Sequence, residues 1–217
     1  MISQTSMQAA YWQLITQLGS SSLLFPVLAV SVVTLWMSQQ KKAIFLWLAA
    51  LSIAVSITLV TKVLFLGWGI GIASIDFTGV SGHSLLATSI LPILFFSIGA
   101  NTQNKLKNIG LWLGLLLGFA VGVSRIVLGM HSISEVLAGW FLGLIVCYLA
   151  IYAIKSHHQG LAYLQLLAVC LLLAFGSTTP NYIPAHDMSV KLALYLSGHD
   201  QPFTRSDLNT AQPSKQF

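Results

Sequence analysis

The chain has 217 residues, of which 56% are hydrophobic and only 7% are charged. Soluble globular domains carry a charge on about a quarter of their residues, so this composition excludes a soluble domain and predicts an integral membrane protein. The net charge of +5 lies mainly in loops, where it indicates membrane topology and contact with anionic lipids and does not indicate nucleic acid.

Six apolar runs are long enough, with their flanks, to cross about 30 Å of hydrocarbon. They are Leu23–Met37, Ile44–Leu66, His83–Gly99, Ile109–Val127, Ile133–Ile154 and Leu161–Phe175. The sequence therefore predicts an all-α, six-transmembrane-helix bundle with short loops. Residues 23–177 form this membrane domain, and residues 1–22 and 178–217 are terminal segments.

Both terminal segments carry apolar residues at helical spacing. These residues are Met7, Tyr11, Leu14 and Leu18 in the first segment and Met188, Leu192, Tyr195 and Leu196 in the second, where Gly198 follows as a helix stop. We expect a short amphipathic helix in each segment, lying in the membrane interface. Such helices serve as anchors, the role that we favour, or they shield a site from the lipid.

The positions of the lysines predict the sidedness of the bundle. Lys41 and Lys42 lie between the first two runs, Lys105 and Lys107 between the third and fourth, and Lys155 between the fifth and sixth. None of these loops contains an acidic residue, so the positive-inside rule places all three in the cytoplasm. The other loops and both termini then face outward.

The first polar cluster, Val80-Ser81-Gly82-His83-Ser84, lies where an outward loop becomes the third apolar helix. The free N–H groups and the dipole of a helix start attract an anion. Ser81 offers a hydroxyl, Gly82 lets a ligand approach the backbone, and His83 can give up a proton near neutral pH. The alternative is an ordinary N-cap serine beside an interfacial histidine.

The second polar cluster consists of Ser124-Arg125, His131 and Glu135. Arg125 is a permanent cation beside a membrane span, and its planar fork of donors suits a phosphate. His131 and Glu135 are four residues apart, so the carboxylate can hold one ring nitrogen while the other nitrogen attacks. A competing interpretation is a capping box between Ser132 and Glu135, and both interpretations can hold together.

Lys62, near the outward end of the second run, has two equally favoured roles: it snorkels toward lipid headgroups or it binds phosphate. A metal site built from His83, His131 and Glu135 is disfavoured, because the tight ligand spacings of zinc sites are absent. Cys147 and Cys170 lie in apolar runs and are expected to be small core residues.

At these residues the chain resembles the type 2 phosphatidic acid phosphatase (PAP2) superfamily. The second signature of that family, usually Pro-Ser-Gly-His, corresponds to Val80-Ser81-Gly82-His83. The third signature corresponds to Ser124-Arg125, His131 and Glu135, with glutamate in place of the usual aspartate. The first signature matches poorly, since Gly69 and Ile70 follow Lys62 where the family has Arg-Pro.

The resemblance implies a role for each matching residue. His131 would be the nucleophile that forms a phosphohistidine, Glu135 would orient it, and His83 would protonate the leaving oxygen. Lys62, Ser81, Gly82 and Arg125 would hold the phosphate. One phosphate-binding arginine of the first signature is missing, and the loop between Gly67 and Gly79 contains no cation to replace it.

We therefore expect a lipid phosphatase that hydrolyses a phosphomonoester or diphosphate of a membrane lipid without metal or other cofactor. The expected location is the cytoplasmic membrane of a bacterium, with the site on the outer face. Its partners would be the lipid phosphate substrate and membrane lipids. Two alternatives remain open: a phosphotransferase that passes the phosphoryl group to an acceptor lipid such as lipid A, and a non-catalytic relative that binds or transports lipids.

Overall fold

The computed structural model describes residues 4–100, 104–154 and 185–210, together with Leu166 and Cys170. Regular structure in these residues is helical, apart from one isolated bridge between Ile72 and Phe77. The helices are α1 (Gln4–Gln17), α2 (Ser21–Met37), α3 (Lys41–Trp68), the 3-10 turn η1 (Ala73–Ile75), α4 (Gly82–Ala100), α5 (Asn104–Val127), α6 (Ile133–Ala153), α8 (Ala185–Ser197) and α9 (Arg205–Thr210). The prediction of an all-α protein is confirmed for this part of the chain.

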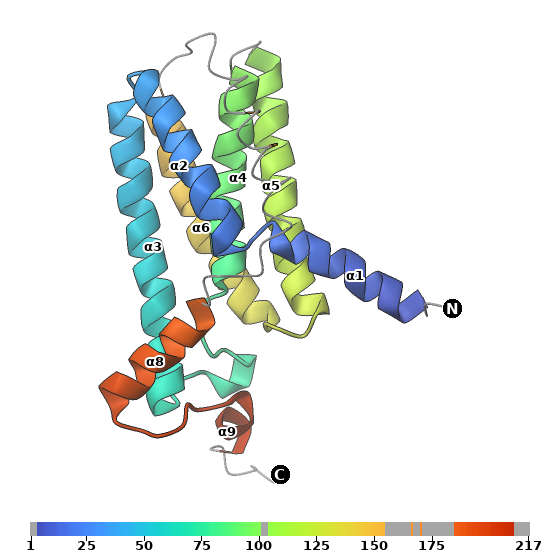
Figure 1. Ribbon diagram of the computed structural model, residues 1–217, viewed down its shortest axis with the longest axis vertical. Coiled ribbons are helices and arrows are strands. Elements are labelled where there is room, and N and C mark those ends of the chain that lie inside the picture. Colours follow the sequence, from blue (N-terminus) through green and yellow to red (C-terminus); the bar gives the residue numbers. More distant parts are fainter. Residues whose placement is uncertain (1–3, 101–103, 155–165, 167–169, 171–184, 211–217) are drawn as a thin grey trace.

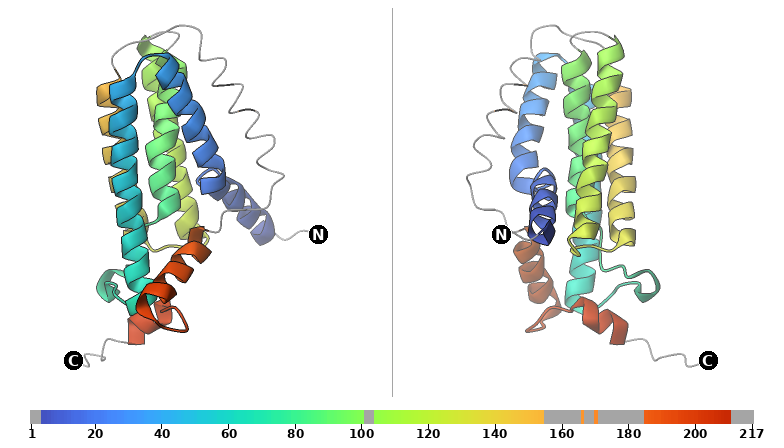
Figure 2. Two further views of the ribbon diagram at one scale, coloured as in Figure 1. Left: turned by 60° about the vertical axis from the view of Figure 1, so that its left-hand side comes forward. Right: turned by 90° about the vertical axis from the view of Figure 1, so that its right-hand side faces the viewer.

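Helix α4 is the centre of the bundle and packs against α2, α3, α5 and α6 (Figures 1 and 2). The buried core contains Trp47 of α3, Ile90 of α4 and Val121 of α5, none of which is exposed. The indole N–H of Trp47 donates to the carbonyl oxygen of Ser89, so α3 is tied to α4 by a polar contact inside the apolar core.

Glycines on α5 let that helix approach α4 closely. A Cβ at Gly110 would lie 2.2 Å from the carbonyl oxygen of Phe95, and a Cβ at Gly114 would lie 2.4 Å from Cα of Pro92. Small residues at such a contact are typical of helices packed in membranes, where backbone proximity replaces the hydrophobic effect as the source of attraction. This packing fixes the position of α4 and therefore of the residues at its start.

Four helical stretches in the described residues are long and apolar enough to span a membrane: Ala9–Met37, Lys41–Trp68, Leu106–Val127 and Ile133–Ala153. A turn at Gly19 divides the first stretch into α1 and α2. The apolar stretch of α4, Gly82–Ile98, is shorter than these four. Five of the six expected runs thus coincide with helices, whereas the sixth, Leu161–Phe175, lies outside the described residues except for Leu166 and Cys170. The six-span layout and the domain boundaries stay predictions.

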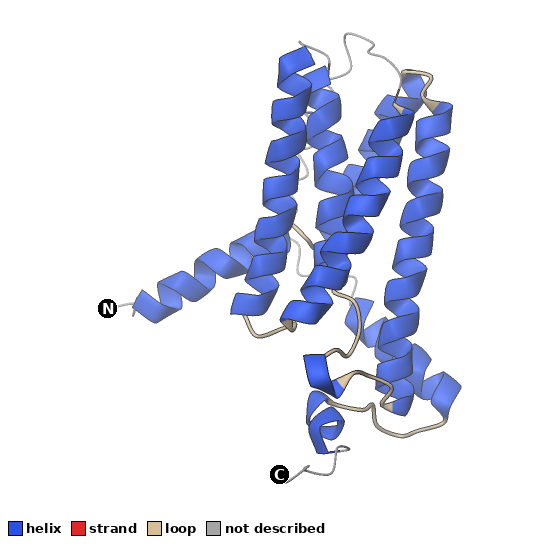
Figure 3. Ribbon diagram, turned by 180° about the vertical axis from the view of Figure 1, so that it is seen from behind, coloured by secondary structure: helices blue, strands red, loops and turns tan. Residues whose placement is uncertain are grey.

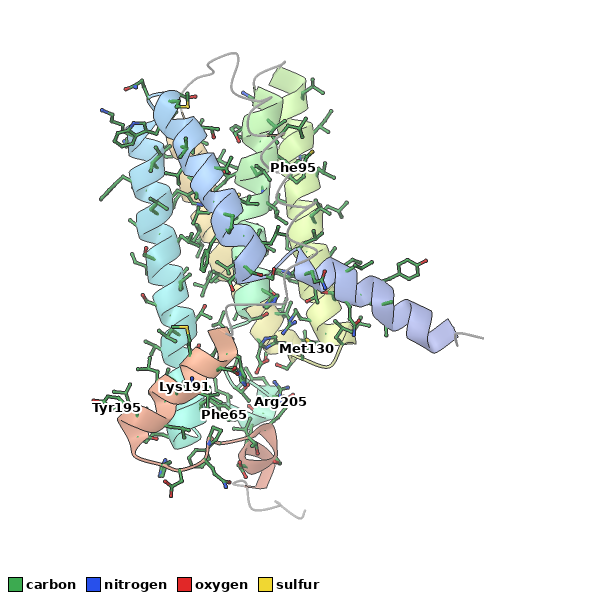
Figure 4. All side chains as sticks on the ribbon, in the orientation of Figure 1. Phe65, Phe95, Met130, Lys191, Tyr195 and Arg205 are labelled. Carbon is green, nitrogen blue, oxygen red and sulfur yellow. The ribbon has the colours of Figure 1, made fainter. Side chains whose placement is uncertain are left out.

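The two expected terminal helices are present as α1 and α8, and Gly198 ends α8 with a φ of 73°. Helix α1 projects sideways from the bundle, while α8 and α9 lie at the end of α3 (Figures 1 and 3). The buried face of α8 carries Ser189 and Ala193 and packs against α3. Its expected apolar stripe faces outward instead, with Tyr195 exposed to 85% (Figure 4). That outward face suits a membrane interface, which stays a prediction.

Candidate active site

A cavity of about 460 Å³ lies between the bundle and the C-terminal segment. It brings together five of the residues predicted from the sequence: Lys62, Gly82, His83, Arg125 and His131. The other two predicted residues, Ser81 and Glu135, are fully buried and are not part of the cavity wall. Residues from both polar clusters of the sequence therefore line one cavity.

The turn between α5 and α6 places His131 beside Arg125. The carbonyl oxygen of Arg125 accepts hydrogen bonds from the N–H groups of Met130 and His131, at 3.0 and 3.2 Å. Gly129 permits this tight turn with a φ of 66°. The end of α5 and the turn that follows it thus bring a cation and an imidazole to the same cavity.

Glu135 holds the ring of His131. Nδ1 of His131 lies 2.6 Å from Oε2 of Glu135, so the carboxylate accepts from Nδ1 and leaves Nε2 free. The capping box is also present, because Ser132 N–H donates to Oε2 of Glu135 at 3.1 Å and the Ser132 hydroxyl accepts from the N–H of Glu135. The contact with His131 and the capping box therefore occur together, and a catalytic role for that contact stays a prediction.

The second oxygen of Glu135 has its own donors. Oε1 accepts from the N–H of Thr78 at 2.8 Å, from the hydroxyl of Thr78, and from Nη2 of Arg205 at 2.9 Å. A fully buried carboxylate with this many donors keeps its negative charge without water. Glu135 is therefore held by hydrogen bonds to both of its oxygens, and its contact with Nδ1 in turn restricts the orientation of the His131 ring.

The start of α4 carries His83 into the cavity and is tied to α6. The N–H of Ser81 donates to the carbonyl oxygen of Glu135 at 3.1 Å, and the hydroxyl of Ser81 accepts from Ser84 at 2.9 Å. The Ser81 hydroxyl thus forms a hydrogen bond within the first turn of α4, while Gly82 and His83 line the cavity. A phosphate-binding role for the Ser81 hydroxyl stays a prediction.

Two of the cations that line the cavity, Lys62 and Arg125, come from helices α3 and α5. Lys62 belongs to α3, and Gly79 passes close over it: a Cβ at Gly79 would lie 3.0 Å from Cγ of Lys62. Arg125 donates through Nη1 to the hydroxyl of Thr16 in α1, at 3.2 Å, and its Nε is buried without a partner among the described residues. An unpaired buried guanidinium donor leaves hydrogen-bonding capacity for an anion.

Burial lowers the pKa of His131 below its ordinary value, and the charges of Lys62 and Arg125 lower it further, although the hydrogen bond and charge of Glu135 oppose this shift. The neutral imidazole is thereby favoured at neutral pH. A neutral ring with Nε2 unoccupied is the form that can attack an electrophile.

Sequence reasoning missed Arg205, Asp76 and Thr16. Arg205 lines the cavity from the C-terminal segment and pairs with Oδ2 of Asp76 at 2.6 Å as well as with Glu135. The chain contains only two arginines, Arg125 and Arg205, and both lie at this cavity. The rarity of arginine in this sequence could have indicated that Arg205 has a role at the site, whereas nothing in the sequence pointed to Thr16.

Within the residues that the structure describes, no group of three or more His, Cys, Asp or Glu side chains could hold a metal ion. The cavity wall is instead rich in nitrogen donors: Lys62, His83, Arg125, His131 and Arg205. This donor set suits an anion with several oxygens, such as a phosphate group.

Comparison with known proteins agrees with this chemistry. The family model described as the PAP2 superfamily matches residues 71–159, which include both polar clusters. An "Uncharacterized 22.5 kDa protein in cps region" of Klebsiella pneumoniae is 33% identical over 208 residues, covering 91% of this chain and 97% of that protein. Phosphatidylglycerophosphatase B of Bacillus subtilis is 30% identical over 76 residues, covering 34% of this chain and 37% of that protein. No solved structure matches the chain. The chain belongs to the PAP2 superfamily, whose members are generally phosphatases.

Proposed function

We propose that the protein is a lipid phosphatase that removes a phosphate from a membrane lipid phosphomonoester or diphosphate through a phosphohistidine at His131. The observation that carries this proposal is the His131–Glu135 pair: Nδ1 lies 2.6 Å from the carboxylate, and Nε2 has no hydrogen-bond partner among the described residues. The pair lies beside a cavity whose wall also contains His83 and Arg125. These are the parts that metal-independent phosphoryl transfer needs.

The proposed reaction has two steps. Nε2 of His131 attacks phosphorus, the bond from phosphorus to the lipid oxygen breaks, and His83 gives its proton to that oxygen. Water then attacks the phosphohistidine, His83 takes a proton from the water, and the bond to Nε2 breaks to release inorganic phosphate. Lys62, Arg125 and the backbone N–H groups at the start of α4 hold the charged oxygens in both steps.

Two observations support a lipid substrate at the outer face. The cavity wall combines the cations with apolar residues from the bundle and from α8, among them Leu86 and Val190, as an amphiphile requires. The lysine-bearing start of α3 lies at the opposite end of the bundle from the cavity, which by the positive-inside rule supports a cavity on the outer face. A bacterial relative named as a phosphatase of a phospholipid agrees with this class of substrate.

The test is an assay of purified protein with phosphatidate, phosphatidylglycerol phosphate, an isoprenyl diphosphate and a lipid A analogue. Free phosphate that appears with wild-type protein, and not with His131→Ala, is the expected result. Excess chelator should leave the activity intact. Label that moves to an acceptor lipid without free phosphate would assign a transferase, and full activity of His131→Ala would overturn the proposal.

A mechanistic test uses the leaving group. His83→Ala should lose activity on lipid phosphates and recover part of it on an aryl phosphate, because a good leaving group needs little help from an acid. After brief exposure to labelled substrate and a rapid quench, wild-type protein should carry acid-labile, base-stable label. His131→Ala should carry none.

A further inference from the structure

Arg205 lies at the cavity although it is 70 residues away from Glu135 in the chain. Its Nη2 donates to Oε1 of Glu135 at 2.9 Å, and its Nη1 donates to Oδ2 of Asp76 at 2.6 Å. Glu135 therefore lies between two nitrogen groups, the guanidinium of Arg205 on Oε1 and the imidazole of His131 on Oε2. Arg205 therefore binds Oε1 of Glu135, the carboxylate oxygen that does not contact His131.

The C-terminal segment that carries Arg205 is held firmly on the end of α3. The N–H of Phe203 donates to the carbonyl oxygen of Leu66 at 2.9 Å, and Nδ1 of His199 lies 2.8 Å from the carbonyl oxygen of Gly67. Gly69 has a φ of 69°, and a Cβ there would lie 2.9 Å from the Phe203 ring. These contacts lie two to six residues before Arg205 in the chain, so they set the position of its backbone.

The electrostatic consequence concerns the imidazole of His131. Several charged and titratable groups surround this imidazole. They are Glu135 of α6, Lys62 of α3, His83 of α4, Arg125 of α5, His186 of α8, and Arg205 with its partner Asp76. Glu135 is the acid in contact with the ring, and Arg205 compensates part of its charge. A carboxylate whose negative charge is partly balanced by Arg205 still orients the ring of His131, but it stabilises the protonated form of that ring less strongly.

We propose that Arg205 is a positioning residue of the active site, which fixes Glu135 from behind and thereby keeps His131 oriented and unprotonated. Asp76 in turn orients Arg205, with its backbone in the left-handed region at a φ of 50°. The C-terminal segment is then a working part of the site and more than a membrane anchor. This inference rests on the proposed role of His131 as the nucleophile.

The experiment compares wild-type protein with Arg205→Gln, Arg205→Lys and Lys191→Gln. Lys191 is the matched control, since it is an exposed cation of the same segment and does not line the cavity. Two readouts are needed: the pH dependence of kcat/KM on a lipid phosphate, and the titration of His131 followed by NMR, with His131→Gln to assign the signal. The NMR readout requires no substrate.

Arg205→Gln should lose about tenfold to a hundredfold in kcat, as expected for one charged hydrogen bond, with a smaller change in KM. Its acid limb and the titration of His131 should both move to higher pH, because Glu135 is no longer compensated. Arg205→Lys should keep the wild-type titration and recover part of kcat, since it restores the charge without the two-pronged geometry. Lys191→Gln should behave as wild type.

Two results would overturn the inference. The first is wild-type kcat and wild-type His131 titration in Arg205→Gln. The second is a raised KM with unchanged kcat and unchanged titration, which would assign Arg205 to phosphate binding. If Arg205→Gln does not fold, Asp76→Asn, which removes the charged partner of Arg205, supplies the comparison with wild type. A wild-type protein that releases no phosphate from any lipid contradicts the proposed function, whereas an unshifted titration in active protein contradicts only this inference.

Discussion

Glu135 closes the start of α6 and also orients His131, two roles that sequence patterns present as alternatives. The backbone of Ser132 and the ring of His131 share Oε2, while Thr78 and Arg205 share Oε1. Glu135 is the only glutamate in the sequence, and its side chain is fully buried. A single buried acid with donors on both oxygens leaves little freedom to the imidazole that it holds.

Replacement of Glu135 by glutamine separates capping from orientation. Glutamine also serves a capping box, but its amide NH2 group would replace Oε1 and face the donors of Thr78 and Arg205, so some thermal stability should be lost while kcat falls by about a hundredfold or more. Ser132→Ala is the control, which should lose about 1 kcal/mol of stability and keep its turnover. Steady-state kinetics and thermal unfolding in detergent measure both quantities. Equal turnover in Glu135→Gln and wild type would leave Glu135 as a cap alone.

The pKa of His131 sets the acid limit of activity. Attack requires the neutral ring, and burial together with Lys62 and Arg125 lowers the pKa of His131 below its ordinary value of about 6.5. Activity should therefore persist below pH 6.5 and fall only as the pH drops through the lowered pKa. The pH dependence of kcat/KM measures this limit. An acid limb well above pH 6.5 that follows His131 in NMR would contradict the assignment.

At the scale of elements, both terminal segments contact the site, and each reaches a different charged residue. Thr16, near the end of α1, accepts from Arg125, and Arg205, at the start of α9, donates to Glu135. Close packing keeps α1 in place: a Cβ at Gly19 would lie 2.5 Å from Cγ1 of Val121. The terminal helices therefore support the second polar cluster from outside the bundle.

The contact between α1 and Arg125 is tested by Thr16→Val, which keeps the shape of the side chain and removes its hydroxyl. Arg125 should then be less well oriented for phosphate, so we expect KM to rise by about threefold to tenfold with little change in kcat. Gln13→Ala, at an exposed position of the same helix, is the control and should behave as wild type. An unchanged KM in Thr16→Val would limit α1 to an anchoring role.

At the scale of the whole molecule, the site lies toward one end of a long helix. Helix α3 has 28 residues and is about 42 Å long, which exceeds the roughly 30 Å of hydrocarbon in a bilayer. Lys41 and Lys42 begin this helix, and Lys62 lies about 9 Å before its other end. The cavity therefore lies near the C-terminal end of α3, slightly inside it, and far from the lysine-bearing first turn. Helices α8 and α9 lie at this C-terminal end of α3 (Figure 3).

This arrangement makes the orientation testable with single cysteines in a background without Cys147 and Cys170. Ser206→Cys, at an exposed position beside the cavity, should react with a membrane-impermeant thiol reagent in intact spheroplasts. Lys42→Cys, exposed at the opposite end, should react only after permeabilisation. The reverse pattern would place the site in the cytoplasm.

Hydropathy and local spacing in the sequence alone determined the helices and most of the site. Apolar runs predicted α2 to α6 because a membrane span must satisfy its backbone internally over its whole length. The four-residue spacing of His131 and Glu135 predicted their contact, because such residues share one helix face. The capping box was predictable for the same local reason.

Only the tertiary structure decided which residues complete the site from a distance. Thr16 and Arg125 are 109 residues apart, and Glu135 and Arg205 are 70 residues apart. Their contacts depend on how α1 and the C-terminal segment dock on the bundle, which follows from close backbone packing and has no periodic signal in the sequence. The outward direction of the apolar stripe of α8 was undetermined for the same reason, because spacing defines a helix face and packing decides where that face points.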